Sequence, residues 1–214
     1  MHTIPLEYLP PTKYLPDKIY PLPEVRLPEN INLATHFLDR HVEQGRGPKV
    51  AIFHEGRQIT FEQLQEDVNR FANALIRLGI KKGERVAIMS PNRPEYIVTC
   101  FSCWRIGAIP VLVHHLLKNQ DIVFRMNDSE ASVMVVSSEV INEVQKSIAQ
   151  CHQLKAVIVM DDVVEDFLYW GDLLAHEDTE AEQSNTTKDD WMRIIYTSGT
   201  TGKPKGVINT IGDM

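Results

Sequence analysis

Short apolar runs alternate with longer amphipathic stretches between about residue 50 and residue 160. The short runs are rich in Val, Ile and Met, and we expect strands at 50–53, 58–60, 85–89, 109–113, 131–137 and 155–160. The longer stretches repeat apolar residues at helical spacing, and we expect helices at 32–43, 60–78, 96–106, 118–128 and 140–151. Strands that alternate with helices of about ten to fifteen residues indicate right-handed crossovers. The predicted fold class is therefore α/β, a mostly parallel sheet flanked by helices.

Local signals mark both ends of the longest predicted helix. Thr60 is a favourable N-cap, and Gln63 three residues later completes a capping box. Gly79 follows the last apolar position and predicts a left-handed stop.

Two segments depart from the α/β pattern. Residues 1–30 are dense in proline, which blocks helices and central strands, so we expect a surface arm; a proline-rich ligand for a partner domain is the alternative. Residues 163–190 are acidic and polar, and we expect a surface excursion that holds one short helix. Its predicted apolar anchors are Phe167, Leu168, Trp170 and Leu173.

Composition limits the classes of function. The chain has 214 residues, 43% of them hydrophobic, so it can bury a substantial core. A net charge of −7 without a basic stripe argues against a general affinity for nucleic acid or anionic membranes. No apolar run reaches the roughly 18 residues of a spanning helix, and the N-terminus does not resemble a signal peptide. The three cysteines, an odd number, suit a reducing compartment, so we expect a cytoplasmic protein.

The candidate chemistry lies between two further strand-like runs, 192–196 and 207–208. Residues 197–206 hold three glycines, four hydroxyl side chains and two lysines. Glycines let the backbone approach a ligand, and consecutive exposed N–H groups favour an anion. We therefore predict that this loop binds the phosphates of a nucleotide. The predicted phosphate ligands are Thr197, Ser198, Gly199, Thr200, Thr201, Gly202, Lys203 and Lys205.

The loop is not the common P-loop. That motif places four residues between its glycines and continues from Lys into a helix. Here two residues separate Gly199 from Gly202, and Pro204 follows Lys203, so we expect a loop between strands. A flexible linker is the alternative. Two flanking strands and two lysines around a proline favour a phosphate-binding loop over a linker. Residues 197–205 are called the phosphate loop below.

Residues 196–206 resemble the phosphate-binding motif of the AMP-forming adenylating enzymes, which include acyl- and aryl-CoA synthetases, adenylation domains and luciferases. Residues 59–64, 69–88 and 104–111 resemble further segments of that family, in the same order, so the resemblance covers about residues 30–214. The segment 39–47 is most similar to the aryl-acid branch, such as benzoate- and aminobenzoate-CoA ligases. One departure is Ile211 after Thr210, where family members often carry His.

The resemblance implies an ATP-dependent ligase. A carboxylic acid attacks the α-phosphate of ATP·Mg²⁺ to give an acyl-adenylate and pyrophosphate, and coenzyme A then takes the acyl group. Within this scheme the loop holds the β- and γ-phosphates. Lys203 and Lys205 neutralise the charge of the departing pyrophosphate, and Lys205 is the predicted catalytic residue.

The resemblance also implies a domain division. We expect a proline-rich arm over residues 1–30 and, over residues 31–214, the N-terminal portion of an AMP-binding domain, truncated after the phosphate loop. The family's adenine and magnesium segment and its adenylation lysine do not occur in this chain, so we expect no metal ligands here and no activity of the chain alone. The alternatives are a non-catalytic nucleotide-binding module and an inactive truncated product.

Three other groupings have a structural and a functional interpretation. Cys100 and Cys103 form a CxxC inside a predicted helix, which favours two buried thiols over redox or metal chemistry. His114 and His115 follow a strand, where adjacent side chains point to opposite faces, although a role near the substrate stays open. The acidic residues of 161–166 indicate a solvated face rather than a magnesium site.

Overall fold

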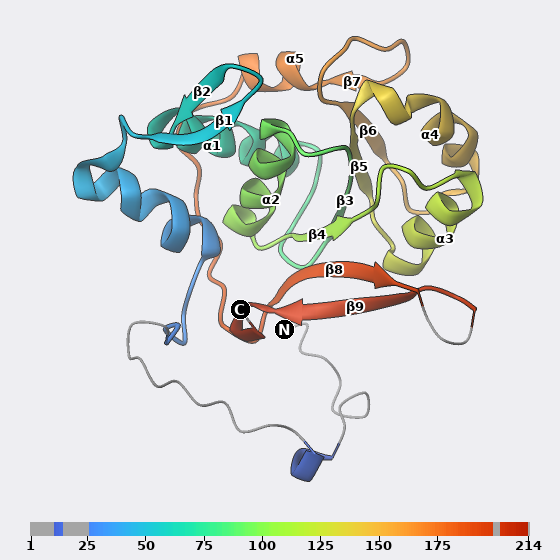
Figure 1. The fold of residues 1–214 in the computed structure, drawn as a ribbon, viewed down its shortest axis with the longest axis horizontal. Helices are drawn as coiled ribbons and strands as arrows, with labels where there is room; N and C mark the ends of the chain where they lie inside the picture. The colour runs from blue at the N-terminus through green and yellow to red at the C-terminus, as the bar shows by residue number, and fades with distance from the viewer. Residues whose placement is uncertain (1–10, 15–25, 199–201, 214) are drawn as a thin grey trace.

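The computed structural model describes residues 11–14, 26–198 and 202–213. In this part of the chain the main sheet has the strand order β7-β6-β5-β3-β4-β8-β9 (Figure 1). The strands are β3 Arg85–Met89, β4 Ile109–Leu112, β5 Val133–Val136, β6 Ala156–Val159, β7 Leu168–Tyr169, β8 Trp191–Thr197 and β9 Lys205–Thr210. All neighbouring strands are parallel except β8 and β9, which form an antiparallel pair. The predicted mostly parallel α/β fold is confirmed.

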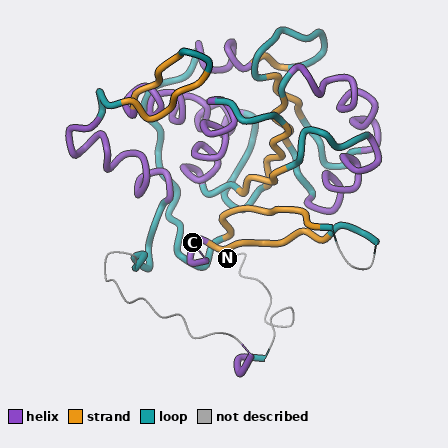
Figure 2. Tube along the Cα trace, viewed as in Figure 1, coloured by secondary structure: helices purple, strands orange, loops and turns teal. Residues whose placement is uncertain are grey.

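Helices cover both faces of the sheet, as Figure 2 shows. Their bounds are α1 Phe61–Arg77, α2 Pro94–Ile106, α3 Asn119–Ser129, α4 Ile141–Ser147 and α5 Trp170–Ala175. Short 3-10 turns occupy Thr12–Tyr14, Ser138–Val140, Ile148–Gln150 and Ile211–Asp213. None of the helices in the described residues is long and apolar enough to cross a membrane.

Alternation along the strands divides the core into two layers. Val86 and Ile88 of β3 pack with α1, α2 and α5, whereas Ala87 and Met89 pack with α3 and α4. Successive side chains of a strand point to opposite faces, so a strand buried on both sides is apolar at every position. This is why the strand runs were recognisable in the sequence.

The predicted ends of α1 are confirmed. The Gln63 N–H donates to Thr60 Oγ1 over 3.2 Å, and the Thr60 N–H donates to Gln63 Oε1 over 3.0 Å. Gly79 has a φ of 86°, in the left-handed region. Burial of the apolar face of α1 includes Phe71, whose ring stacks on Trp170 with 3.9 Å between centroids.

The first helical segment, residues 33–46, contains the π-helical turns Thr35–Asp39 and Val42–Arg46 and bends at Gly45, with a φ of 74°. It leads into a separate antiparallel pair, β1 Val50–His54 and β2 Arg57–Thr60. Asp39 of the segment forms a buried ion pair with Arg105 of α2, Oδ1 to Nη2 2.7 Å. The buried ion pair therefore fixes the segment to α2.

The acidic excursion is tied to the body at several points. Its short helix is α5, where Trp170 and Leu173 are buried as predicted, whereas Leu168 is 37% exposed in the edge strand β7. Strand β7 could not be predicted, because two residues carry no periodicity. Beyond α5, Asn69 of α1 donates to the carbonyl oxygen of Thr179 over 2.7 Å. The excursion thus crosses the helical layer and delivers the chain to β8.

Candidate phosphate site

The candidate site is the turn of the β8–β9 hairpin. Thr197 pairs with Lys205 in the antiparallel register, so the predicted loop between strands is confirmed. Thr197, Ser198, Gly202, Lys203 and Lys205 are all exposed. Gly199, Thr200 and Thr201 lie outside the described residues.

Two positions of the motif require glycine, each for a different physical reason. Gly202 has a φ of 90°, which L side chains rarely adopt, so the turn requires glycine there. Gly206 in β9 lies beside the ring of Tyr196, where a Cβ atom would be 3.3 Å from Tyr196 Cζ and from Ile194 Cγ2. Glycine at position 206 therefore allows the tyrosine ring to lie across the hairpin.

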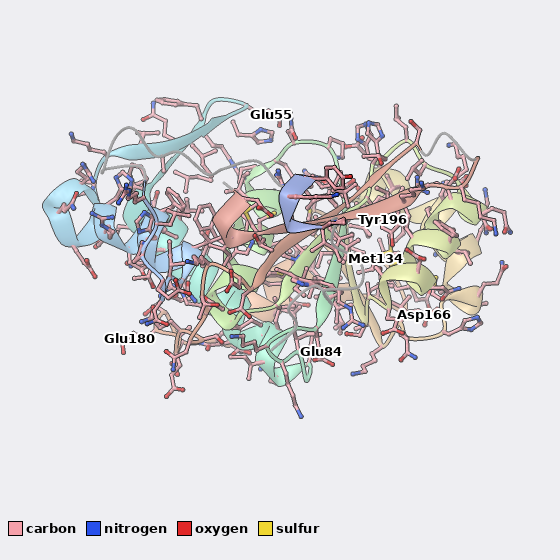
Figure 3. All side chains as sticks on the ribbon, turned by 90° about the horizontal axis from the view of Figure 1, so that it is seen from below. Glu55, Glu84, Met134, Asp166, Glu180 and Tyr196 are labelled. Carbon is pink, nitrogen blue, oxygen red and sulfur yellow. The ribbon has the colours of Figure 1, made fainter. Side chains whose placement is uncertain are left out.

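Tyr196, which is labelled in Figure 3, connects the hairpin to α3. Its hydroxyl donates to Asp128 Oδ2 over 2.7 Å, and the Arg125 guanidinium lies 5.4 Å from the ring centroid. Burial, and then the bond to Asp128, raise the pKa of Tyr196 well above its usual value, so the hydroxyl stays a donor. No local pattern in the sequence predicts this contact, because Asp128 lies 68 residues away in the chain.

A cleft of about 630 Å³ opens beside the base of the loop. Its walls come from the residues that follow β3, from those that follow β4, and from β8. They are Ser90, Pro91, Asn92, Tyr96, Leu112, Val113, His114, His115, Leu117, Arg125, Ile195 and Tyr196. Open α/β sheets bind ligands outside the carboxyl ends of their strands, and the cleft lies at that edge.

His114 and His115 both line this cleft. Their rings stack with 4.8 Å between centroids, so the prediction that they point to opposite faces is wrong. The reason is that β4 ends at Leu112, before the two histidines, and strand alternation no longer applies. The Leu116 N–H donates to His114 Nδ1 over 3.2 Å, which leaves the proton of a neutral His114 on Nε2.

An ion pair lies at the carboxyl ends of β3, β5 and β6. Asp161, interpreted from sequence as part of a solvated acidic face, is exposed as a residue, but its side chain is 19% exposed and pairs with Arg93. Its Oδ1 also accepts from the Ser138 N–H over 2.7 Å. Burial raises the pKa of Asp161, but the bonds from Ser138 and Arg93 outweigh it and hold the pKa below the usual value. Asp162 is exposed, as predicted.

Cys100 and Cys103 are both buried on α2, as predicted. Burial raises the pKa of Cys100 to about 12, so its thiol is protonated at neutral pH. Among the described residues, no group of three or more His, Cys, Asp or Glu side chains is arranged to hold a metal ion.

Comparison with known proteins decides the family. The sequence model described as AMP-binding enzyme matches residues 38–214. The chain belongs to the AMP-binding enzyme family. Among curated members, it is 34% identical over 204 residues to the acetyl-coenzyme A synthetase of Desulfatibacillum aliphaticivorans and 33% identical over 204 residues to that of Streptomyces coelicolor. Each alignment covers 85% of this chain and 31% of the relative, so the chain spans about a third of the length of these relatives.

Solved structures of family members have the same fold. The anthranilate CoA ligase AuaEII, in complex with anthranoyl-AMP, superposes with a TM-score of 0.82 and 29% identity, over 86% of this chain and 36% of that one. The acyl-CoA synthetase of Brucella canis superposes with a TM-score of 0.74 and 27% identity, over 85% of this chain and 34% of that one. The predicted family and its fold are confirmed.

Proposed function

We propose that the protein carrying this chain activates a carboxylic acid with ATP to an acyl-adenylate and then forms a thioester with coenzyme A. In this proposal the phosphate loop binds the β- and γ-phosphates of ATP and the pyrophosphate that leaves. The observation that carries the proposal is the exposed hairpin turn, with its hydroxyl groups and two lysines, at the carboxyl edge of the sheet and beside a cleft.

The register of the hairpin supports a joint role for Thr197 and Lys205. Residues that pair directly in an antiparallel ladder project from the same face, and residues two apart on one strand share that face. Thr197, Lys205 and Ile195 therefore belong to one face, and Ile195 lines the cleft. A hydroxyl and an ammonium group thus stand next to each other on one face of the hairpin.

The chemistry of this set suits a leaving pyrophosphate. Negative charge grows on the phosphate oxygens as the α–β phosphoanhydride bond breaks, and preplaced donors stabilise that charge more in the transition state than in the ground state. In the proposal, Lys205 supplies the compact positive charge and Lys203 adds a second ammonium. Mg²⁺ reaches the loop as the ATP complex. Thr197 and Ser198 add hydroxyl donors, and Gly202 allows the turn.

The domain division is also a proposal. The family match over residues 38–214 supports a partial AMP-binding domain over 31–214, and we keep residues 1–30 as a separate proline-rich arm. The acid substrate is a small carboxylic acid. Similar proteins are named for acetyl-coenzyme A and for anthranilate, an aryl acid, so the aryl-acid branch stays part of the proposal.

The test is ATP–pyrophosphate exchange by the enzyme that carries this chain, with and without the Lys205→Ala substitution. Removing one preplaced charge-stabilising donor is expected to lower the exchange rate roughly 10²–10³-fold. Lys155→Ala is the matched control, because Lys155 is also an exposed lysine, 56% exposed, but lies before β6 at the amino edge of the sheet. Equal exchange rates for Lys205→Ala and wild type would exclude the proposed role.

A non-catalytic nucleotide-binding module is the second candidate, because the phosphate loop is exposed and can bind a nucleotide whether or not a reaction follows. Titration calorimetry measures ATP binding to the 214-residue chain, and a turnover assay measures the activity of a longer form that contains it. ATP binding without turnover of the longer form favours the module.

A further inference from the structure

The phosphate loop projects beyond the sheet that supports it. In the described residues β8 pairs with β4 only through Ile194 and Ile195, because β4 ends at Leu112. From Tyr196 onward β8 has only β9 as a strand neighbour. An isolated two-stranded hairpin is at best marginally stable in water. The turn therefore needs support where the hairpin leaves the sheet.

Tyr196 stands at that point. Its hydroxyl donates to Asp128 Oδ2 over 2.7 Å, and its ring lies over Gly206, its partner in the β8–β9 register. Phe124 of α3 adds an edge contact, with 6.1 Å between ring centroids. One side chain thus touches both strands of the hairpin and joins them to α3.

Helix α3 is itself fixed to the sheet. At its C-terminal end, Arg85 of β3 donates from Nε to the carbonyl oxygen of Ser129 over 2.7 Å and from Nη2 to the carboxylate of Glu130 over 2.8 Å. This end of α3 is therefore held in place relative to the sheet. A hydrogen bond from the hairpin to it sets the orientation of the hairpin.

We propose that Tyr196 and Asp128 are a positioning pair, which holds the phosphate loop at the orientation that binds pyrophosphate. This inference rests on the proposed function of the loop. Neither residue touches phosphate in this account. Their bond removes freedom from the hairpin before the ligand arrives, so that less ordering has to occur during binding.

The experiment measures the binding of inorganic pyrophosphate to the 214-residue chain by titration calorimetry, well below its thermal midpoint. Tyr196→Phe keeps the ring over Gly206 and removes the hydroxyl, and Asp128→Ala removes the acceptor. Each is expected to weaken binding about three- to tenfold, because the net contribution of a typical intramolecular hydrogen bond is of that order and this bond is exposed. The double variant is expected to bind no more weakly than either single variant, since both remove the same bond.

Two variants separate positioning from general stability. Asp128→Asn keeps an oxygen that accepts from Tyr196 and is expected to bind within twofold of wild type. Asn127→Ala breaks a bond of the same helix, Nδ2 to the carbonyl oxygen of Gln150 at 2.8 Å, that lies away from the hairpin. It is expected to lower the thermal midpoint without changing pyrophosphate affinity.

The outcomes are distinguishable. If the wild-type chain binds no pyrophosphate, or Lys205→Ala binds it as tightly as wild type, the proposed function of the loop fails. If Lys205→Ala weakens binding but Tyr196→Phe and Asp128→Ala match wild type, only the positioning pair is overturned. Additive losses in the double variant would also overturn it, because they would show two independent effects.

Discussion

Replacement of Asn32 by alanine tests how the N-terminal helical segment is held to the rest of the fold. The Asn32 amide is 9% exposed, and its Nδ2 lies 2.9 Å from the carbonyl oxygen of Trp104, 3.0 Å from that of Arg105 and 3.1 Å from that of Ser184. Its Oδ1 accepts from the Ala34 N–H over 3.1 Å. One side chain therefore joins the start of residues 33–46, the end of α2 and the excursion that precedes β8.

The magnitude follows from these contacts. An amide nitrogen has two hydrogens, so the three carbonyl contacts amount to about two full hydrogen bonds, each contributing about 1 kcal/mol net. Loss of the cap on Ala34 costs about another 0.5–1 kcal/mol. The carbonyl of Arg105 keeps a second donor, the Ser184 N–H at 2.8 Å, which limits the loss. Asn32→Ala is expected to lower the free energy of unfolding by about 2–3 kcal/mol, or roughly 4–12 °C in thermal midpoint for a chain of this size.

Urea unfolding followed by circular dichroism measures this difference. Asn73→Ala is the matched control, because Asn73 also donates to two carbonyls of the excursion, those of Asp178 and Glu180, but is only half-buried and its bonds are exposed. A loss of about 1 kcal/mol or less is expected. Asn32→Asp keeps the cap acceptor and loses both donors, so it is expected to be at least as unstable as Asn32→Ala at pH 7. Wild-type stability for Asn32→Asp would refute the reasoning, since it would mean that the donors contribute nothing.

Two further predictions concern titratable groups. Asp161→Asn is expected to lower the free energy of unfolding by about 1 kcal/mol at pH 7. Because the folded pKa of Asp161 lies below its unfolded value, the difference between the two proteins is fully present above about pH 4 and disappears as the pH falls through the folded pKa. Urea denaturation at a series of pH values measures this difference. Cys100 has a buried thiol with a pKa of about 12, so it is expected to react with iodoacetamide at pH 8 at least tenfold more slowly in the native chain than in urea. Peptide mass spectrometry follows the labelling of Cys100. Equal rates in the two conditions would contradict its buried position.

Features set by neighbouring residues were predictable from the sequence. The capping box of Thr60 and Gln63 and the left-handed Gly79 need only local chain geometry, and both appear where they were expected. The apolar strands were recognisable because burial on both faces makes every position apolar. The hairpin around the phosphate loop was predictable because Pro204 excludes the helix that a P-loop requires.

Features set by distant residues were not predictable. The bond between Tyr196 and Asp128 depends on α3 packing beside β8, which no local pattern encodes. The pairing of Asp161 with Arg93 depends on the order of β3, β5 and β6 in the sheet, so composition alone indicated a solvated acidic face. The stacked histidines 114 and 115 do not alternate because they lie beyond the end of β4, where the backbone is no longer extended strand.

The most direct test of the account is a titration of the isotope-labelled chain with inorganic pyrophosphate, followed through backbone amide NMR shifts. The largest shifts are expected on the N–H groups of residues 197–203, 205 and 206, and Lys205→Ala is expected to reduce them at equal pyrophosphate concentration. Shifts confined to residues outside the hairpin, or none at millimolar pyrophosphate, would contradict the claim that this turn binds the departing pyrophosphate.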